Sequence, residues 1–485
     1  MTSGNNPQNL RLSTRGSDSG VVEISSLSGS ETSIHEGTAP CTPLSPSSAF
    51  VQTTISDVTN SFLDAVVFCH WDNILGPRLE QVWHISDRPQ PHRNILRFIT
   101  TQVLSGEICR ELHTGQVDFK FSDVPDKGIV VPSFVFSAER GGDLGLHAIA
   151  LVIPNSELTI FLQTNNILQA WFTRMIAKLR VLLNKRRFGD KDMQLFTSWL
   201  QKCLQMLSSL QEAGLPHTIH LTYTALCPSC NLEQDFLQQA IASHLMTFGR
   251  SIVVGHLADR VNLVVHTLSL FSWEWERACS RQVLDGKQWP YAHDLCIQGL
   301  LKNKEGSYDL PVQDFMYSKF PSTIIDVQKR NVQQTSSLVE HPRQSYMVAV
   351  EELSQLYHDK AEACSIAAVY QSADIPETLI KTLLDELHKL PVQSGIREAF
   401  IAHFMHLLQR RALTMIKYVE VETQKGRQPL KGGLKKLCQD LNLSTDGDFR
   451  IILATAEKLK PGLCDILYRE KRHVADYLTN SGEIF

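Results

Sequence analysis

Two cysteines separated by two residues are the strongest candidates for chemistry in this sequence of 485 residues. Cys227 and Cys230 enclose Pro228 and Ser229, a spacing that suits half of a zinc site or a redox dithiol placed before a helix. A structural zinc ion needs two further ligands, and no second Cys-x-x-Cys or matching Cys/His pair follows at finger-like spacing. We therefore expect a plain loop, and a metal or redox enzyme is the weakest alternative.

The other signatures of reactive centres are missing from the sequence. It contains no P-loop, no dinucleotide-binding turn, no His-Glu-x-x-His zinc pattern and no Gly-x-Ser-x-Gly nucleophile elbow. The glycine-rich run 141–145 falls between predicted strands, which favours a hairpin loop. His403 and His406 lie one helical turn apart, yet no nearby acid or cysteine completes a metal site. We expect no catalytic residue, no metal and no cofactor.

A basic stretch runs from Arg410 to Lys436 and contains two acidic residues, Glu420 and Glu422. It fits an acidic membrane surface or an acidic patch on a protein, although long charged side chains often simply cover an exposed helix. We favour the simpler explanation. Aromatic residues are not interleaved among these cations, and the formal net charge of −4 gives no general attraction to nucleic acid. We therefore expect no nucleic-acid partner.

The bulk composition predicts a soluble cytoplasmic protein with more than one domain. The length exceeds what one hydrophobic core usually serves. No apolar run approaches the roughly 20 residues that span a bilayer, and the start lacks a signal-peptide pattern. Eleven scattered cysteines suit reduced thiols. Residues 1–54 are rich in Ser, Thr, Gly, Asn and Pro, so we predict a disordered tail there.

Residues 55–212 predict an α+β domain. Short apolar runs predict strands at 63–69, 79–85, 107–112, 117–121, 129–136, 146–153 and 158–162. A helix is expected at 93–104, and two long helices should follow the last strand. Strands followed by helices in this order predict an antiparallel sheet with helices packed on it.

Residues 215–360 predict an α/β domain, because helices at 232–246 and 258–270 alternate with strands at 251–254 and 295–300. Such alternation predicts a mainly parallel sheet, and Asn231 with Gln234 forms a plausible capping box for the first helix. The polar span 326–344 should be an exposed connection. Residues 361–470 are expected to be helical, with helices at 397–421, 434–441 and 449–459, and residues 471–485 form a C-terminal tail.

The run 71–78, Trp-Asp-Asn-Ile-Leu-Gly-Pro-Arg, lies between two apolar stretches and predicts a strand, a Gly-Pro turn and a returning strand. Trp71 has less reason to be buried at such a tip than the other tryptophans have. Together with the runs 251–255, 417–426 and 457–463, this hairpin resembles the DENN family, and in particular its longin-DENN regulators. The resemblance extends over about residues 62–467.

The resemblance implies an N-terminal longin module followed by a DENN module. DENN proteins bind small GTPases of the Rab type, and many promote release of GDP by reshaping the switch regions. Such exchange depends on surface complementarity rather than on a reactive side chain. It implies a Rab-type or Arf-type partner, and the interface candidates at the hairpin are Trp71, Asp72, Asn73, Gly76, Pro77 and Arg78.

The subfamily that the chain resembles also implies a setting in the cell. Its members work with a second longin-DENN protein and a WD-repeat propeller, in autophagy and at endosomes, lysosomes and autophagosomes. Membrane association is then expected only through partner chains. The alternative function is a non-catalytic scaffold of a GTPase-activating complex, whose arginine finger lies on the partner chain.

Overall fold

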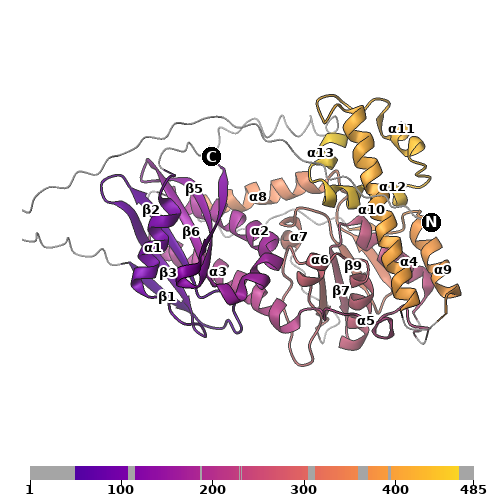
Figure 1. Cartoon of the computed structure of the whole chain (residues 1–485), viewed down its shortest axis with the longest axis horizontal. Helices are drawn as coiled ribbons and strands as arrows, with labels where there is room; N and C mark the ends of the chain where they lie inside the picture. Colours follow the sequence, from indigo (N-terminus) through magenta and orange to yellow (C-terminus); the bar gives the residue numbers. More distant parts are fainter. Residues whose placement is uncertain are drawn as a thin grey trace, which may run out of the picture. The chain divides into compact units, whose positions relative to one another are not determined.

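The computed structural model describes residues 50–107, 115–185, 188–228, 230, 232–303, 312–358, 370–391 and 395–468. Within this part of the chain, six strands form a first sheet in the order β1-β3-β2-β6-β5-β4 (Figure 1). Its strands are β1 (Val51–Ile55), β2 (Ala65–Asp72), β3 (Gly76–Ile85), β4 (Val117–Val124), β5 (Ile129–Arg140) and β6 (Asp143–Pro154). β1 pairs parallel to β3, and the other pairs are antiparallel.

Helices cover both faces of the first sheet, because successive strand residues point to opposite sides. On one face, Val67 and Val82 pack with Ile99 of α1 (Arg93–Leu104). On the other, Phe68 and Trp83 join the cores of α2 (Leu158–Leu183) and α3 (Asp190–Ala213). The Trp83 indole also donates a 2.8 Å hydrogen bond to Thr197 of α3. The predicted layout of this half is therefore confirmed.

A second sheet has five described strands in the order β11-β10-β9-β7-β8. They are β7 (Ser251–Gly255), β8 (Ile297–Leu301), β9 (Thr323–Asp326), β10 (Asn331–Gln334) and β11 (Gln371–Ser372). The three strands β7, β8 and β9 are parallel, as predicted, whereas β10 and β11 add antiparallel pairs. α4 (Gln234–Met246) and α5 (Ala258–Ser269) contribute to the core on one face. Phe315 of α7 (Val312–Met316) packs on the other.

The remaining described helices follow the second sheet or connect its strands. They are α6 (Glu274–Ala278), α8 (His341–Tyr357), α9 (Leu379–Lys389), α10 (Ile396–Glu422), α11 (Gly433–Asp440), α12 (Asp446–Leu459) and α13 (Leu463–Leu467). α12 is almost wholly buried, and it packs against both α10 and α4. Two sheets with these helices make a mixed α+β protein, consistent with the predicted longin-DENN architecture. None of the described helices has the length and apolar character needed to cross a membrane.

Two predicted elements were wrong. Residues 158–162, predicted as a strand, are the first residues of α2, because a short apolar run fits a helix start as well as a strand. The span 326–344 is not an exposed connection, since it contains β10 and the start of α8. Some of its polar residues are buried with partners: Gln334 is 6% exposed, and its amide donates to Ser243 Oγ at 2.9 Å. The polar composition of this span therefore masked a partly buried strand.

Of three smaller predictions, one needs revision and two fall mostly or partly outside the described residues. Residues 51–54, assigned to the tail, form most of β1, which pairs with β3. Most of the predicted strand 107–112 and Asn231 of the expected capping box lie outside the described residues. α4 begins at Gln234 with Glu233 as its N-cap, and no side chain caps it there.

Candidate protein-docking site

The β2–β3 hairpin ends in a turn made by Asn73, Ile74 and Leu75. Asp72 faces Gly76 across the ladder, and its Oδ1 accepts hydrogen bonds from the backbone N–H groups of Ile74 at 2.8 Å and Leu75 at 2.9 Å. These two bonds lower the pKa of the Asp72 carboxyl. The predicted Gly-Pro turn is thus shifted, because Gly76 already belongs to β3, with a φ of +77°.

Two neighbouring aliphatic side chains project from this turn. Ile74 is 92% exposed and Leu75 is 57% exposed, although each would gain free energy by leaving water. Trp71 is half-buried and packs against the sheet core on the α1 side. The sequence-predicted candidates are thus mostly half-buried, with Asn73 exposed. Ile74 and Leu75 were not among these candidates, although two consecutive aliphatic residues in a predicted turn indicate exposed apolar side chains.

A second hairpin brings another exposed apolar residue to the same end of the sheet. β5 and β6 are joined through Gly141 and Gly142, both with positive φ, which confirms the predicted hairpin loop. Leu144, just past this turn, is 62% exposed. Because β6 pairs with β2 up to the pair His70 and His147, the two turns lie at the same end of neighbouring strands. We call Ile74, Leu75 and Leu144 the apolar tips.

A charged cluster lies at the base of the two hairpins. The register shifts between Phe68 and Cys69, so Glu80 of β3 bulges without a ladder partner. Its Oε2 lies 3.1 Å from His70 Nδ1 on β2 and 2.9 Å from Arg140 Nη1 on β5. Burial acts to raise the pKa of the Glu80 carboxyl, but the hydrogen bonds from His70 and Arg140 outweigh it and lower that pKa. A carboxylate therefore ties three strands together.

An imidazole lies next to this cluster without titrating at neutral pH. The His147 ring stacks on Phe68 and Phe136, with ring centroids 5.9 Å and 5.7 Å apart. Burial lowers the pKa of His147 to about 4, so the ring is neutral near pH 7. The base of the two hairpins is therefore a packed support rather than an acid or base.

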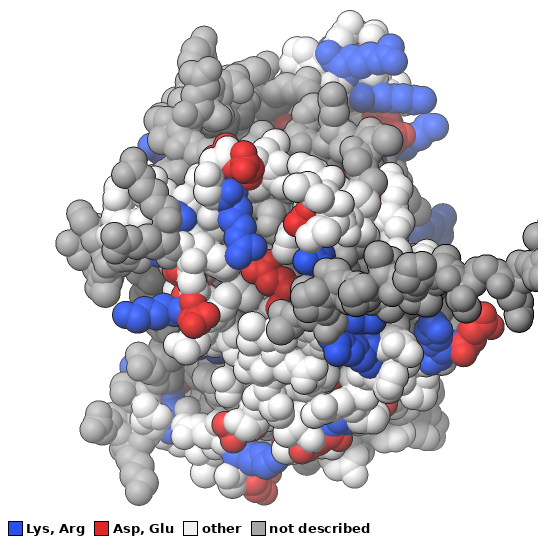
Figure 2. All heavy atoms as spheres, turned by 90° about the vertical axis from the view of Figure 1, so that its left-hand side faces the viewer, with Lys and Arg blue, Asp and Glu red and all other residues white. Residues whose placement is uncertain are grey.

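On the face of the protein that Figure 2 shows, the described residues have no dominant sign of charge. Figure 2 shows the side on which Figure 1 draws the first sheet, and the described Lys and Arg side chains there are mixed with Asp and Glu. Mixed charge gives little long-range attraction for a ligand of either sign. Recognition at this end would therefore depend mainly on shape and on apolar contact.

Polar contacts join the first sheet's helices to the second half of the chain. Arg174 of α2 forms an ion pair with Asp294, which precedes β8, and its Nη1 donates to the Tyr317 carbonyl at 2.7 Å. One turn further along α2, Lys178 Nζ lies 2.6 Å from Glu352 Oε1 of α8. These contacts link the layer that supports the hairpins to the second sheet.

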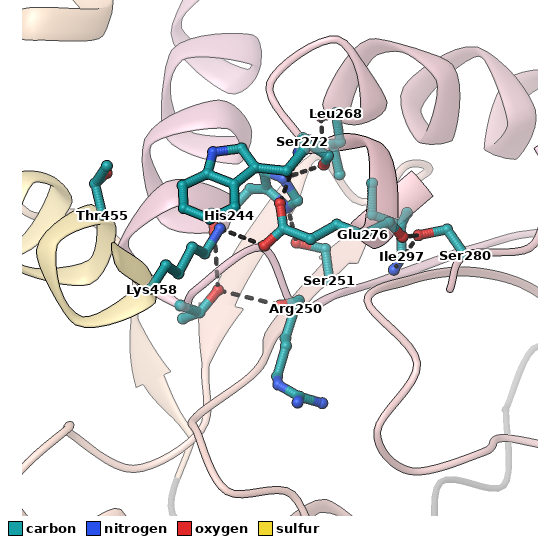
Figure 3. A network of polar contacts seen from close by, with 12 residues as sticks. His244, Arg250, Ser251, Leu268, Ser272, Glu276, Ser280, Ile297, Thr455 and Lys458 are labelled. Carbon is teal, nitrogen blue, oxygen red and sulfur yellow. Dashed lines mark hydrogen bonds and ion pairs between the residues drawn. The ribbon is translucent and has the colours of Figure 1, made fainter. Parts of the chain in front are cut away.

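One constellation looks like a reactive centre, and its burial argues against that function (Figure 3). His244 Nδ1 lies 2.9 Å from Ser251 Oγ, and its Nε2 lies 3.1 Å from Ser272 Oγ. Beside it, Glu276 of α6 forms an ion pair with Lys458 of α12. His244 and Glu276 are both fully buried, so a substrate has no access. The network joins α4, β7, α6 and α12, which is a structural function.

The Cys-Pro-Ser-Cys segment forms a turn in which the Cys230 N–H donates to the Cys227 carbonyl at 2.9 Å. Both cysteines are half-exposed. Within the part of the chain that the structure describes, no three His, Cys, Asp or Glu side chains gather closely enough to hold a metal ion. The geometry of the described residues thus gives no support to a zinc or dithiol enzyme.

Comparison with known proteins agrees with this architecture. The model of the C9orf72-like protein family matches residues 98–341. The human protein named guanine nucleotide exchange factor C9orf72 is 33% identical over 470 residues, which cover 88% of this chain and 96% of the relative. Its mouse homologue is 33% identical over 466 residues, with the same coverage. The chain therefore belongs to the C9orf72-like protein family.

Proposed function

We propose that this protein is a guanine-nucleotide exchange factor for a small GTPase of the Rab type, and that the GTPase docks on the apolar tips. The human and mouse relatives are named as exchange factors, and the matched region covers 96% of each. The structural observation that carries the proposal is the exposure of Ile74, Leu75 and Leu144 on two hairpins whose base is held by Glu80.

Exchange requires no change to any covalent bond of the protein. The factor must bind the nucleotide-free GTPase more tightly than the GDP-bound form, and this difference weakens GDP binding by the same factor. A thousandfold effect corresponds to about 4 kcal/mol. Full burial of an Ile or Leu side chain contributes about 1.5–3 kcal/mol. Three such side chains therefore suffice if the partner covers them only in its nucleotide-free conformation.

The test is release of a fluorescent GDP analogue from a panel of Rab and Arf proteins, with the full chain alone and with its partner chains. The variant Ile74→Asp/Leu75→Asp should slow the accelerated release by about tenfold or more, because charged groups cannot take the place of buried aliphatic contacts. Leu257→Asp is the matched control, since Leu257 is 64% exposed before α5 and distant in sequence from the tips. The control should release GDP like the parent protein.

The same assay separates exchange from the scaffold alternative. If no GTPase releases GDP faster in either setting, the exchange proposal is wrong. If the assembled complex then accelerates GTP hydrolysis, the chain is a non-catalytic subunit of a GTPase-activating assembly. In that case the arginine finger belongs to the partner chain, and substituting it should abolish hydrolysis.

The cellular setting is a further part of the proposal. The protein is cytoplasmic, works with a second longin-DENN protein and a WD-repeat propeller, and is recruited to endosomes, lysosomes and autophagosomes in autophagy and membrane trafficking. The support is the resemblance of the runs 71–78, 251–255, 417–426 and 457–463 to the longin-DENN regulators. Isolation of the tagged full chain should recover one longin-DENN protein and one WD-repeat protein in fixed ratio. Recovery of the chain alone would contradict this part.

A further inference from the structure

A cationic surface on the C-terminal helices has no function in the proposed GTPase site. Eight Lys and Arg residues between positions 410 and 436 are all exposed: Arg410, Arg411, Lys417, Lys425, Arg427, Lys431, Lys435 and Lys436. None of the eight forms an ion pair with an acidic residue in the described part of the chain. The ion pairs of α12 and its C-cap use Arg450, Lys458 and Lys460 instead. We call these eight residues the cationic face.

Two of the acidic groups near the cationic face have partners outside it. Glu420 of α10 forms an ion pair with Lys460, which lowers the pKa of its carboxyl. Asp440 of α11 accepts a 2.6 Å hydrogen bond from the Tyr418 hydroxyl. The positive charge of this region is therefore left largely unbalanced within a chain whose formal net charge is −4.

Apolar side chains interrupt the cations on α10. Leu407, Arg410, Leu413, Lys417 and Val421 recur every three or four residues, so they lie along one side of the helix. The three apolar members are exposed, at 40%, 54% and 62% respectively. With about 1.5 Å of rise per residue, this row is about 20 Å long. Alternating cationic and apolar groups are typical of helices that lie at a lipid interface.

The opposite side of α10 anchors the row to the fold. Met415 and Val419 are fully buried, and they share a core with Leu437 of α11 and Leu453 of α12. The row is therefore the outward side of a packed helix. Figure 1 draws α11 and the adjoining end of α10 at the upper right.

We propose that the cationic face docks directly on an anionic lipid membrane. Charge complementarity argues for this partner, because each Lys or Arg near an acidic membrane strengthens binding by about fivefold. The cations are spread over α10, the loop that follows it and α11. This spread suits an extended acidic surface as the partner better than one acidic side chain. Leu413 and Val421 would enter the headgroup layer. The inference is independent of GTPase exchange, and it replaces the expectation of attachment only through partner chains.

The rival partner is an acidic amphipathic helix of another protein. A groove of about 960 Å³ beside the row is lined by Leu383, Phe404, Leu407 and Arg410 from α9 and α10. Glu386 also lines this groove and would repel an acidic helix. The loop and α11 cations Lys425, Arg427, Lys431 and Lys436 lie outside its lining. A membrane would contact the whole cationic face, whereas a helix bound in the groove would contact only a small part of it.

The test is cosedimentation of the full chain with phosphatidylcholine vesicles, with and without phosphatidylserine. Binding should require phosphatidylserine and should fall as salt is raised. The triple variant Lys417→Glu/Lys425→Glu/Lys431→Glu should lower the partition coefficient by about 100-fold or more. The control Lys191→Glu/Lys329→Glu/Lys381→Glu changes net charge equally at exposed positions outside the cationic face, and should retain most of the binding.

A second variant tests insertion rather than attraction. Leu413→Gln/Val421→Gln removes two exposed apolar side chains without disturbing the core, so circular dichroism should be unchanged while vesicle binding weakens by about tenfold or more. No binding to phosphatidylserine vesicles at low salt overturns the proposal. Equal losses in the two charge triples overturn it as well. GDP release measured without vesicles should be unaffected by all these variants, so failure here is distinct from failure of the exchange proposal.

Discussion

Arg174 of α2 pairs with Asp294 across the junction between the two halves of the chain, and Asp294 is only 4% exposed. Burial acts to raise the pKa of the Asp294 carboxyl, but the nearby guanidinium groups of Arg174 and Arg250 lower it overall. Asp294 is therefore charged in the folded protein. The ion pair therefore helps to hold together the two halves of the chain that a GTPase could contact.

Loss of the Asp294 charge should destabilise the protein. Asp294→Asn leaves two arginines next to a buried neutral amide, and we expect the free energy of unfolding to fall by about 2–3 kcal/mol. Denaturant unfolding followed by fluorescence measures this. Asp285→Asn is the control, because Asp285 is exposed in the same loop region and should change stability little. Equal stability of the two variants would contradict a structural function for the ion pair.

Stability should decrease in mild acid because of buried neutral histidines. Burial lowers the pKa of His244 from 6.5 to about 3, so the unfolded chain binds a proton that the folded chain does not bind between those values. The free energy of unfolding contributed by His244 is fully present above pH 6.5. It decreases as the pH falls toward 3, by about 1.4 kcal/mol per pH unit.

The variant His244→Gln checks this assignment. Gln can still hydrogen-bond to Ser251 or Ser272, but it does not titrate. The number of protons taken up on unfolding between pH 6 and 4, which sets the slope of the unfolding free energy with pH, should therefore decrease by about one. The exposed His217→Gln is the matched control and should leave the slope unchanged. An unchanged slope in His244→Gln would show that His244 is not the titrating group.

Much of the fold was predictable from local patterns. The helix predicted at 93–104 matches α1, because Leu96, Ile99 and Val103 lie on one face and are buried against the sheet. Elements whose sequence pattern fits more than one kind of structure were not predictable. β10 carries polar residues that find buried partners, and the start of α2 is an apolar run that fits two structures.

The candidate site was predictable only in part. The hairpin followed from the strands around residues 71–78, but the Gly-Pro pair suggested the wrong turn residues. The Asx-type bonds of Asp72 place Ile74 and Leu75 at the tip instead. Leu144 joins them through the pairing of β2 with β6, a long-range contact that no local pattern contains. The support from Glu80 depends on a β-bulge, which the sequence does not mark.

The conformation of the tip should depend on the Asp72 carboxylate. Asp72→Ala removes the acceptor of two backbone N–H groups, so amide hydrogen exchange at Ile74 and Leu75 should become about tenfold faster. Asp72→Asn keeps an oxygen acceptor and should have an intermediate effect. If exchange at both amides is the same in all three proteins, the turn is not held by Asp72.

The cysteines should differ in reactivity according to their burial. Cys227 and Cys230 are half-exposed and should be alkylated in the native protein. Burial raises the pKa of the Cys69, Cys203 and Cys279 thiols to about 12, so these should react only after unfolding. Mass spectrometry of iodoacetamide-treated protein, before and after denaturation, measures this. Rapid native labelling of Cys203 would contradict the packing between α3 and the first sheet.

The most direct test of the central claim compares the affinity of the full chain for one GTPase in three states: nucleotide-free, GDP-bound and GTP-bound. Exchange by docking predicts that the nucleotide-free form binds at least about 100-fold more tightly than the GDP-bound form. It also predicts that Ile74→Asp/Leu75→Asp removes most of this preference. Equal affinity for all three states, or a preference that the double variant leaves intact, would contradict a site at the apolar tips.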